Sequence, residues 1–199
     1  MPKGNLSFDV SWALAANGHI YAASDADQND RVTGQTSFAN TTPTFLLHNP
    51  STSGKVCIPF YYQLAQTGTV AGGDIGVDTE VRATSAYASS GTSEGVTALF
   101  VAPPTGFAAP TNSCLLYSGA TASAAAGRAI GHVTLAPDVS PAEGIINIYE
   151  WQAPTGLMLG PGSSLGVYTY AGTTGPTWGW HFVWAEVPVA MLTRLRGMI

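Results

Sequence analysis

Glycine and proline punctuate this sequence so often that long helices are excluded. The chain has 23 Gly and 13 Pro in 199 residues, and they interrupt nearly every window of about fifteen residues. No segment keeps apolar residues at positions i, i+3, i+4 and i+7 over several turns, as an amphipathic helix requires. Short apolar runs between turn-forming residues remain, which is typical of a β-sandwich or barrel. We therefore expect an all-β protein.

The expected strands follow directly from these runs. They are Thr44–His48, Lys55–Gln66, Glu80–Ala86, Val96–Val101, Ser113–Tyr117, Ile130–Leu135, Ile145–Trp151, Ser164–Tyr170 and Trp178–Val187. Pro59 lies within the longest run, so that strand should be an edge, be bulged or be divided between two sheets. The only segment with helical character is Ala120–Arg128, whose alanines favour a helix and whose Gly127 does not.

Residues 1–43 precede the first confident strand. Residues 24–34 are polar and 38–43 have the composition of a loop. We expect residues 1–43 to form an irregular N-terminal arm or loop segment, lying on a neighbouring subunit, and residues 44–199 to form one β-sandwich domain. The apolar stretch 10–16 is broken by Ser11 and ends at Asn17 and Gly18, so no secretory signal or membrane span is predicted.

Charge is scarce along the whole chain. Charged residues make up 10% of it, against about 25% in ordinary soluble domains. The net charge is −5 and no cluster of basic residues is visible, so we expect no nucleic-acid binding, which needs a concentrated positive surface. A surface with so few ions suits burial against a partner chain.

The C-terminal run carries an aromatic stripe. Strand alternation places Trp178, Trp180, Phe182, Trp184 and Glu186 on one face. Large aromatic side chains lie mainly in cores and interfaces, so this face is the sandwich core, a subunit interface or an exposed sugar-stacking platform. Glu186 slightly favours an interface or rim, and we take these residues as candidate interface residues.

The segment Gly162–Gly166 matches the Gly-x-Ser-x-Gly pattern around the nucleophile of some hydrolases. That pattern requires a strand before the serine and a helix after it. Here a Pro161-Gly162 turn precedes Ser164 and strand-like residues 167–170 follow it. His181 lies downstream, but nothing positions an acid beside it. We therefore predict a loop-to-strand junction, no catalytic residue and no enzyme activity.

An acidic segment resembles the start of a calcium loop. Asp25, Asp27, Asn29 and Asp30 offer oxygen ligands at short spacing. The expected glycine is replaced by Asp30 and the closing glutamate by Thr36, which excludes an EF-hand. A solvated loop is the expected structure, and a calcium bridge between subunits is the alternative.

Other chemistry-bearing residues are dispersed. Asp74, Asp78 and Glu80 lie in a Gly-rich setting that favours a solvated loop, although paired carboxylates also serve glycosidases. Cys57 and Cys114 are expected to be buried, reduced thiols. The histidines have no metal-ligand spacing: His19, His48, His132 and His181. We expect no metal and no cofactor.

Two stretches resemble a known group of proteins. Residues 44–58 (TFLLHNPSTSGKVCI) combine a strand, an Asn-Pro turn, Ser-Gly-Lys and a second strand. Residues 157–167 (LMLGPGSSLGV) contain a Pro-Gly turn, and 182–188 (FVWAEVP) form a Trp-x-Glu-x-Pro ending. These motifs are similar to those of the small jelly-roll virion proteins of tailed bacteriophages, which include head decoration or cement proteins. Residues 1–43 match nothing in that group.

The resemblance implies an antiparallel β-sandwich of jelly-roll type and a structural virion protein. Such a protein is made in the host cytoplasm, forms a homotrimer and sits on the outer surface of the capsid. It stabilises the head by bridging subunits of the major capsid protein, without contact to nucleic acid or membrane. The alternative is a tail fibre, spike or knob protein that binds host-surface glycans, followed by a free carbohydrate-binding or hydrolytic domain.

Overall fold

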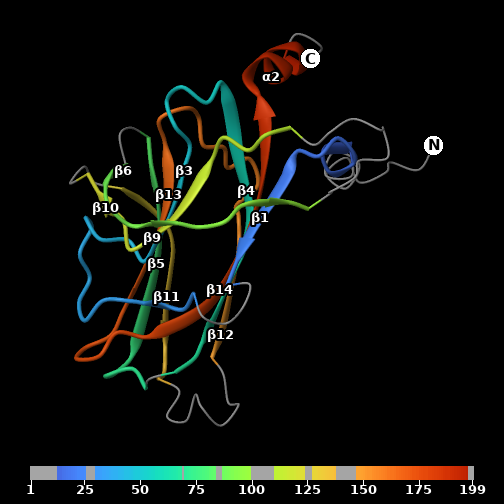
Figure 1. The fold of residues 1–199 in the computed structure, drawn as a ribbon. Helices are drawn as coiled ribbons and strands as arrows, with labels where there is room; N and C mark the ends of the chain where they lie inside the picture. The colour runs from blue at the N-terminus through green and yellow to red at the C-terminus, as the bar shows by residue number, and fades with distance from the viewer. Residues whose placement is uncertain are drawn as a thin grey trace.

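The chain folds into two antiparallel sheets that pack face to face as a β-sandwich (Figure 1). This computed structural model describes residues 13–25, 30–68, 70–83, 87–99, 110–123, 127–137 and 147–196. Sheet A contains, in spatial order, β12 (Ile148–Gln152), β4 (Lys55–Gln66), β14 (Thr177–Pro188), β1 (Ile20–Ser24) and β8 (Thr97–Ala98), with β2 (Val32–Thr33) also paired to β14. Sheet B contains, in spatial order, β11 (Arg128–Leu135), β5 (Ile75–Arg82), β13 (Ser164–Tyr170), β3 (Phe45–His48), β9 (Leu115–Ser118) and β7 (Thr92–Ser93). The short strands β6 (Tyr87–Ser89) and β10 (Thr121–Ala122) pair with each other.

The core lies between the two sheets. Alternate residues of β14 are buried, as expected when a strand turns one face toward a second sheet. Phe45 of sheet B packs against Trp180 and Phe182 of sheet A, with ring centroids 5.5 and 5.3 Å apart. Tyr62 of β4 stacks on Phe182 at 5.1 Å. These rings join both sheets into one aromatic core within a single chain.

The longest strands form the centre of sheet A. β4 and β14 pair antiparallel from Trp178 opposite Gln66 to Pro188 opposite Lys55. Their register shifts between Val183 and Trp184, where Trp184 lies opposite Pro59. Because proline cannot donate a ladder hydrogen bond, the strand tolerates Pro59 at this bulge. The bulged alternative expected for this strand is confirmed.

The segment 120–128 is not helical in its described residues. Among its described residues, Thr121 and Ala122 form β10 and Arg128 begins β11, since backbone pairing with neighbouring strands overrides the modest helix preference of alanine. A helix instead follows β14 as α2 (Val189–Arg196), and residues 13–16 are also helical. In the described part of the chain, no helix has the length and apolarity needed to cross a membrane.

Part of the segment expected to be an arm belongs to sheet A. Strand β1 pairs with β14, from Ile20 opposite Ala185 to Ser24 opposite His181, and with β8 on its other side. Tyr21 and its neighbours in β1 are buried. The run is short, alanine-rich and followed by acidic residues, so its own sequence gives a weak strand signal. Pairing on both sides, rather than local preference, holds it in the sheet. Residues 1–12 lie outside the described part of the chain.

Candidate functional site

The predicted interface residues lie inside the sandwich. Trp178, Trp180, Phe182, Trp184 and Glu186 are each at most 5% exposed within the single chain. We therefore assign them to the core, the first of the alternatives considered, and correct their assignment to an interface. Sheet B covers this face of β14, so the stripe is not accessible to a second subunit and cannot stack on a sugar.

Glu186 is a buried carboxylate whose oxygens are fully engaged. Its Oε2 atom accepts from the Nζ atom of Lys55 at 3.0 Å and the backbone N–H of Ser113 at 2.7 Å. Its Oε1 atom accepts from the backbone N–H of Cys114 at 2.9 Å and the indole N–H of Trp184 at 3.2 Å. Buried charges persist where partners of this kind offset the loss of water. The carboxylate thus ties β14 to β4 and to the segment that enters β9 in sheet B.

The thiols lie beside this carboxylate. Cys57 and Cys114 are both buried and free, and Cys57 is opposite Glu186 in the β4–β14 pair. Burial raises the pKa of the Cys57 thiol well above its usual value, and contact with Cys114 adds to the shift. A buried thiol with a raised pKa is a poor nucleophile, so these residues act as core packing groups.

Ser164 is placed where it cannot attack a substrate. It is fully buried in β13, and its hydroxyl has no hydrogen-bond partner among the described residues. His181 lies on β14 in the other sheet. A strand follows the serine, as the sequence predicts. The Gly162–Gly166 segment is a turn that enters a strand, and the strand–turn–helix geometry of a nucleophile elbow is not formed.

The acidic segment is only partly described. The backbone N–H of Asp30 donates to Oδ1 of Asp25 at 3.2 Å, while Asp27 and Asn29 lie outside the described residues. Within the described ranges, His, Cys, Asp and Glu side chains form no group of three or more that could hold a metal ion.

Asp78 and Glu80 lie on a strand, and the expected solvated loop is not formed there. Both belong to β5, which pairs with β11 and β13. Asp78 binds Nδ1 of His132 at 2.6 Å through one oxygen and accepts from the Tyr170 hydroxyl at 2.9 Å through the other. Burial, together with this bond to Asp78, raises the pKa of Tyr170 to about 12. Sequence reasoning missed the cluster because each residue comes from a different strand of sheet B.

A polar and aromatic group covers part of the outer face of sheet A. Glu150 Oε1 accepts from the Tyr61 hydroxyl at 3.2 Å and from Nε2 of Gln63 at 2.8 Å. The ring of His181 lies 6.3 Å from that of Tyr61. Glu150 is exposed and the other side chains are partly exposed. We call Tyr61, Gln63, Glu150 and His181 the outer platform; strand pairing alone brings them together.

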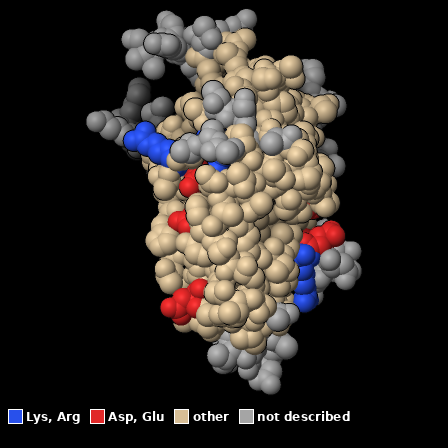
Figure 2. Space-filling view, turned by 90° about the vertical axis from the view of Figure 1, so that its left-hand side faces the viewer, with Lys and Arg blue, Asp and Glu red and all other residues tan. Residues whose placement is uncertain are grey.

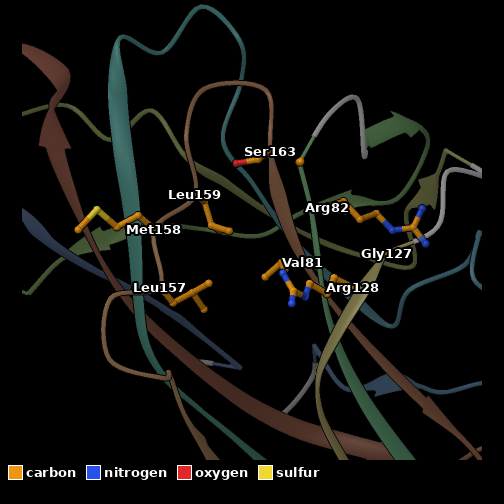
Figure 3. A pocket seen from close by; sticks show the side chains of 9 residues that line it. Val81, Arg82, Gly127, Arg128, Leu157, Met158, Leu159 and Ser163 are labelled. Atoms are coloured by element: carbon orange, nitrogen blue, oxygen red, sulfur yellow. The ribbon is translucent and has the colours of Figure 1, made fainter.

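A pocket opens at one side of the sandwich (Figure 3). Its volume is about 360 Å³. It is lined by residues of β5, the start of β11 and the loop between β12 and β13: Val81, Arg82, Ala83, Gly127, Arg128, Leu157, Met158, Leu159 and Ser163. The sequence does not predict this pocket, because residues 81–83, 127–128 and 157–163 come together only through the fold.

Comparisons with known proteins return no relative. No family model matches the chain, and no match was found among curated proteins or solved structures.

Proposed function

We propose that this chain is a structural virion protein, most plainly a capsid decoration protein that stabilises the head from its outer surface. The residues that resemble jelly-roll virion proteins of tailed bacteriophages, 44–58, 157–167 and 182–188, motivate the proposal. The two-sheet sandwich is compatible with it, and the jelly-roll connection pattern is part of the proposal. Because fold alone does not determine function, the proposed role rests on the properties of the surface.

The observation that supports this proposal most directly is a complete core beneath a surface with few charges. The aromatic stripe of β14 is buried within one chain, so the core is complete without a partner. The many uncharged residues of the sequence therefore also cover the surface. Figure 2 shows a face on which Lys, Arg, Asp and Glu are few and scattered. Uncharged surface costs less to desolvate against another protein than charged surface does. Such a surface fits a protein that works in contact with copies of itself and with capsid subunits.

One end of the sandwich offers apolar contacts. Helix α2 extends beyond the ends of the sheets (Figure 1), and Met191 on it is 43% exposed. Leu99 is 53% exposed and its N–H donates to the carbonyl of Ile20, at the end of β1 opposite Ala185. Both apolar side chains therefore lie toward the end of the molecule where β14 leads into α2. We propose this end as the contact between protomers of a trimer.

The proposal is tested on heads of the virus that encodes the chain. Heads assembled without the protein should release their genome at a lower temperature than complete heads, and adding purified protein should restore the difference. Quantitative mass spectrometry of separated heads and tails provides the second readout. Presence on tails alone, or unchanged genome retention without the protein, would remove the decoration function.

The outer platform favours a second candidate function, binding of host-surface glycans by a tail fibre, spike or knob protein. Sugars bind where an aromatic ring stacks on the sugar face beside groups that bond hydroxyls, and Tyr61 next to Glu150 and Gln63 supplies both. A glycan array with the purified protein tests it. Binding that is lost in Tyr61→Ala and kept in Tyr87→Ala would support this candidate, and absence of binding to any glycan would exclude it.

A further inference from the structure

The pocket between sheet B and the loop before β13 combines an apolar wall with a cation. Leu157 and Leu159 form one wall, and Val81 of β5 lies across from them, whereas the side chain of Met158 points away from Val81 (Figure 3). Leu159 is held by paired backbone hydrogen bonds with Cys57 of β4, of 2.9 and 2.8 Å. The wall is therefore fixed to sheet A, and the pocket is formed by the fold itself.

The two arginines at the pocket differ in what they can bind. Arg82 is buried, donates to the backbone carbonyls of Asn40 and Ser123 and to the Tyr168 hydroxyl, and lies 3.6 Å from Oε2 of Glu80. Figure 3 shows its side chain running away from the wall of residues 157–159. Its charge is thus used inside the protein.

Arg128 is the available cation. It is exposed at the start of β11, and no hydrogen bond or ion pair joins its side chain to the described residues. Figure 3 shows its guanidinium turned toward Val81 and Leu157. A guanidinium presents a planar fork of donors that matches a carboxylate. A ligand that satisfies Arg128 therefore also touches apolar side chains.

We propose that this pocket binds a carboxylate attached to a short aliphatic group. The carboxylate pairs with Arg128, and the aliphatic group covers Val81 and Leu157. A purely polar anion would leave the apolar wall in water, and a neutral hydrocarbon would leave Arg128 without an acceptor. The volume of about 360 Å³ lies at the lower end of the roughly 300–1,000 Å³ range of small-molecule pockets, which fits one aliphatic chain. The inference stands independently of the proposed virion role.

Isothermal titration of the full chain with matched probes tests the site. Octanoate, 1-octanol and octylammonium share one aliphatic chain and differ in charge. Octanoate should bind with a Kd below about 1 mM and at least about tenfold more tightly than either of the others, the factor expected for one charge-assisted pair. N-acetylleucine carries its carboxylate on a peptide-like group, as the C-terminus of a protein chain does. If it binds more tightly than octanoate, the natural ligand is such a chain end; if octanoate binds more tightly, the natural ligand is a free fatty acid.

The decisive variant is Arg128→Gln, which changes an exposed side chain and should leave the fold intact. It should abolish the preference for octanoate over 1-octanol, and Arg128→Lys should keep part of it. Arg31→Gln, an exposed arginine elsewhere on the surface, is the matched control and should bind octanoate as the parent does. Equal binding of octanoate and 1-octanol, an unchanged preference in Arg128→Gln, or no octanoate binding at all would overturn the proposal.

Discussion

The carboxylate of Glu186 lies 3.0 Å from the ammonium group of Lys55, in a position where the glutamate has no solvent exposure and the lysine side chain is 15% exposed. The same carboxylate accepts backbone N–H bonds from Ser113 and Cys114. One buried anion therefore joins β4, β14 and the entry to β9. It acts as a clamp between the two sheets.

Removing this clamp should destabilise the sandwich strongly. Glu186→Ala leaves several buried N–H groups without an acceptor and removes the counter-ion of Lys55, whose Nζ atom keeps the carbonyl of Thr111. It should lower the free energy of unfolding by about 3–5 kcal/mol. Urea titration followed by tryptophan fluorescence measures the loss. Glu150→Ala, which removes an exposed carboxylate from the same sheet, should change stability by less than about 1 kcal/mol. Equal effects of the two changes would show that Glu186 is not a clamp.

Ser164→Ala should stabilise the protein. The serine hydroxyl is buried without a partner among the described residues, and leaving such a group unsatisfied costs about 1–3 kcal/mol. We expect a gain of about 1 kcal/mol in urea unfolding. A fluorophosphonate probe should not label the parent protein. Loss of stability in the variant, or labelling that depends on Ser164, would contradict this account of the turn.

Truncation distinguishes the start of the chain from strand β1. Deleting residues 1–12 removes none of the strands described here, so the shortened protein should keep a cooperative thermal transition. Deleting residues 1–40 removes β1, whose side chains Tyr21 and Ala23 are buried in the core between the sheets, and should abolish that transition. Circular dichroism melting compares the two. A folded protein after the longer deletion would mean that β1 is dispensable.

Acidification should weaken the fold through His48, which is half-buried. Burial lowers the pKa of His48 below the ordinary value of 6.5, so the unfolded chain binds the proton first as pH falls. The stability contribution is present above about pH 6.5 and is lost as pH falls toward the folded-state pKa. His19 and His181 are shifted in the same direction, also mainly by burial.

The histidine effect is measured as a difference between variants. Urea unfolding at about pH 7.5 and about pH 5.5 should show a smaller loss of stability in His48→Gln than in the parent. Burial raises the pKa of Glu94, so this group adds stability as pH falls, opposite to the effect of the histidine. The effect of His48 is therefore taken from the difference between the variant and the parent. Gln152→Ala, an exposed change that titrates nothing, should keep the parental loss. A variant as pH-sensitive as the parent would exclude His48 as a source.

The oligomer is expected to depend on the end that carries α2. Light scattering should give a trimer for the purified protein, and Met191→Asp should reduce its mass, because a charge placed on an apolar contact must be desolvated. Val70→Asp is the control: Val70 is 41% exposed and follows the opposite end of β4. A monomeric parent protein, or equal dissociation by both variants, would contradict the assignment of this end.

The sequence predicts strands where apolar runs are long and clearly bounded. Lys55–Gln66 and Ser164–Tyr170 match β4 and β13, and Trp178–Val187 lies within β14. The run Glu80–Ala86 is displaced, because β5 begins at Ile75 and ends at Arg82 and is fixed by pairing with β11 and β13. Pairing partners are not visible in a local pattern.

The sites were less predictable than the strands. Alternation places Trp178 and Glu186 on one face but cannot tell whether a second sheet of the same chain or another subunit covers it. Asp78 and His132 meet through the register of β5 and β11, and Arg128 and Leu157 line one pocket because a loop packs against sheet B. Tertiary structure brings these residues together, so their spacing in the sequence does not predict it.

The central claim is that this sandwich bridges capsid subunits from the outside. Cryo-electron microscopy of the virus particle, with and without the gene for this chain, tests it most directly. The account predicts trimeric β-sandwich density on the outer capsid surface, spanning neighbouring capsid subunits and missing from particles that lack the gene. Capsids with identical outer surfaces in both samples, or density confined to the tail, would contradict it.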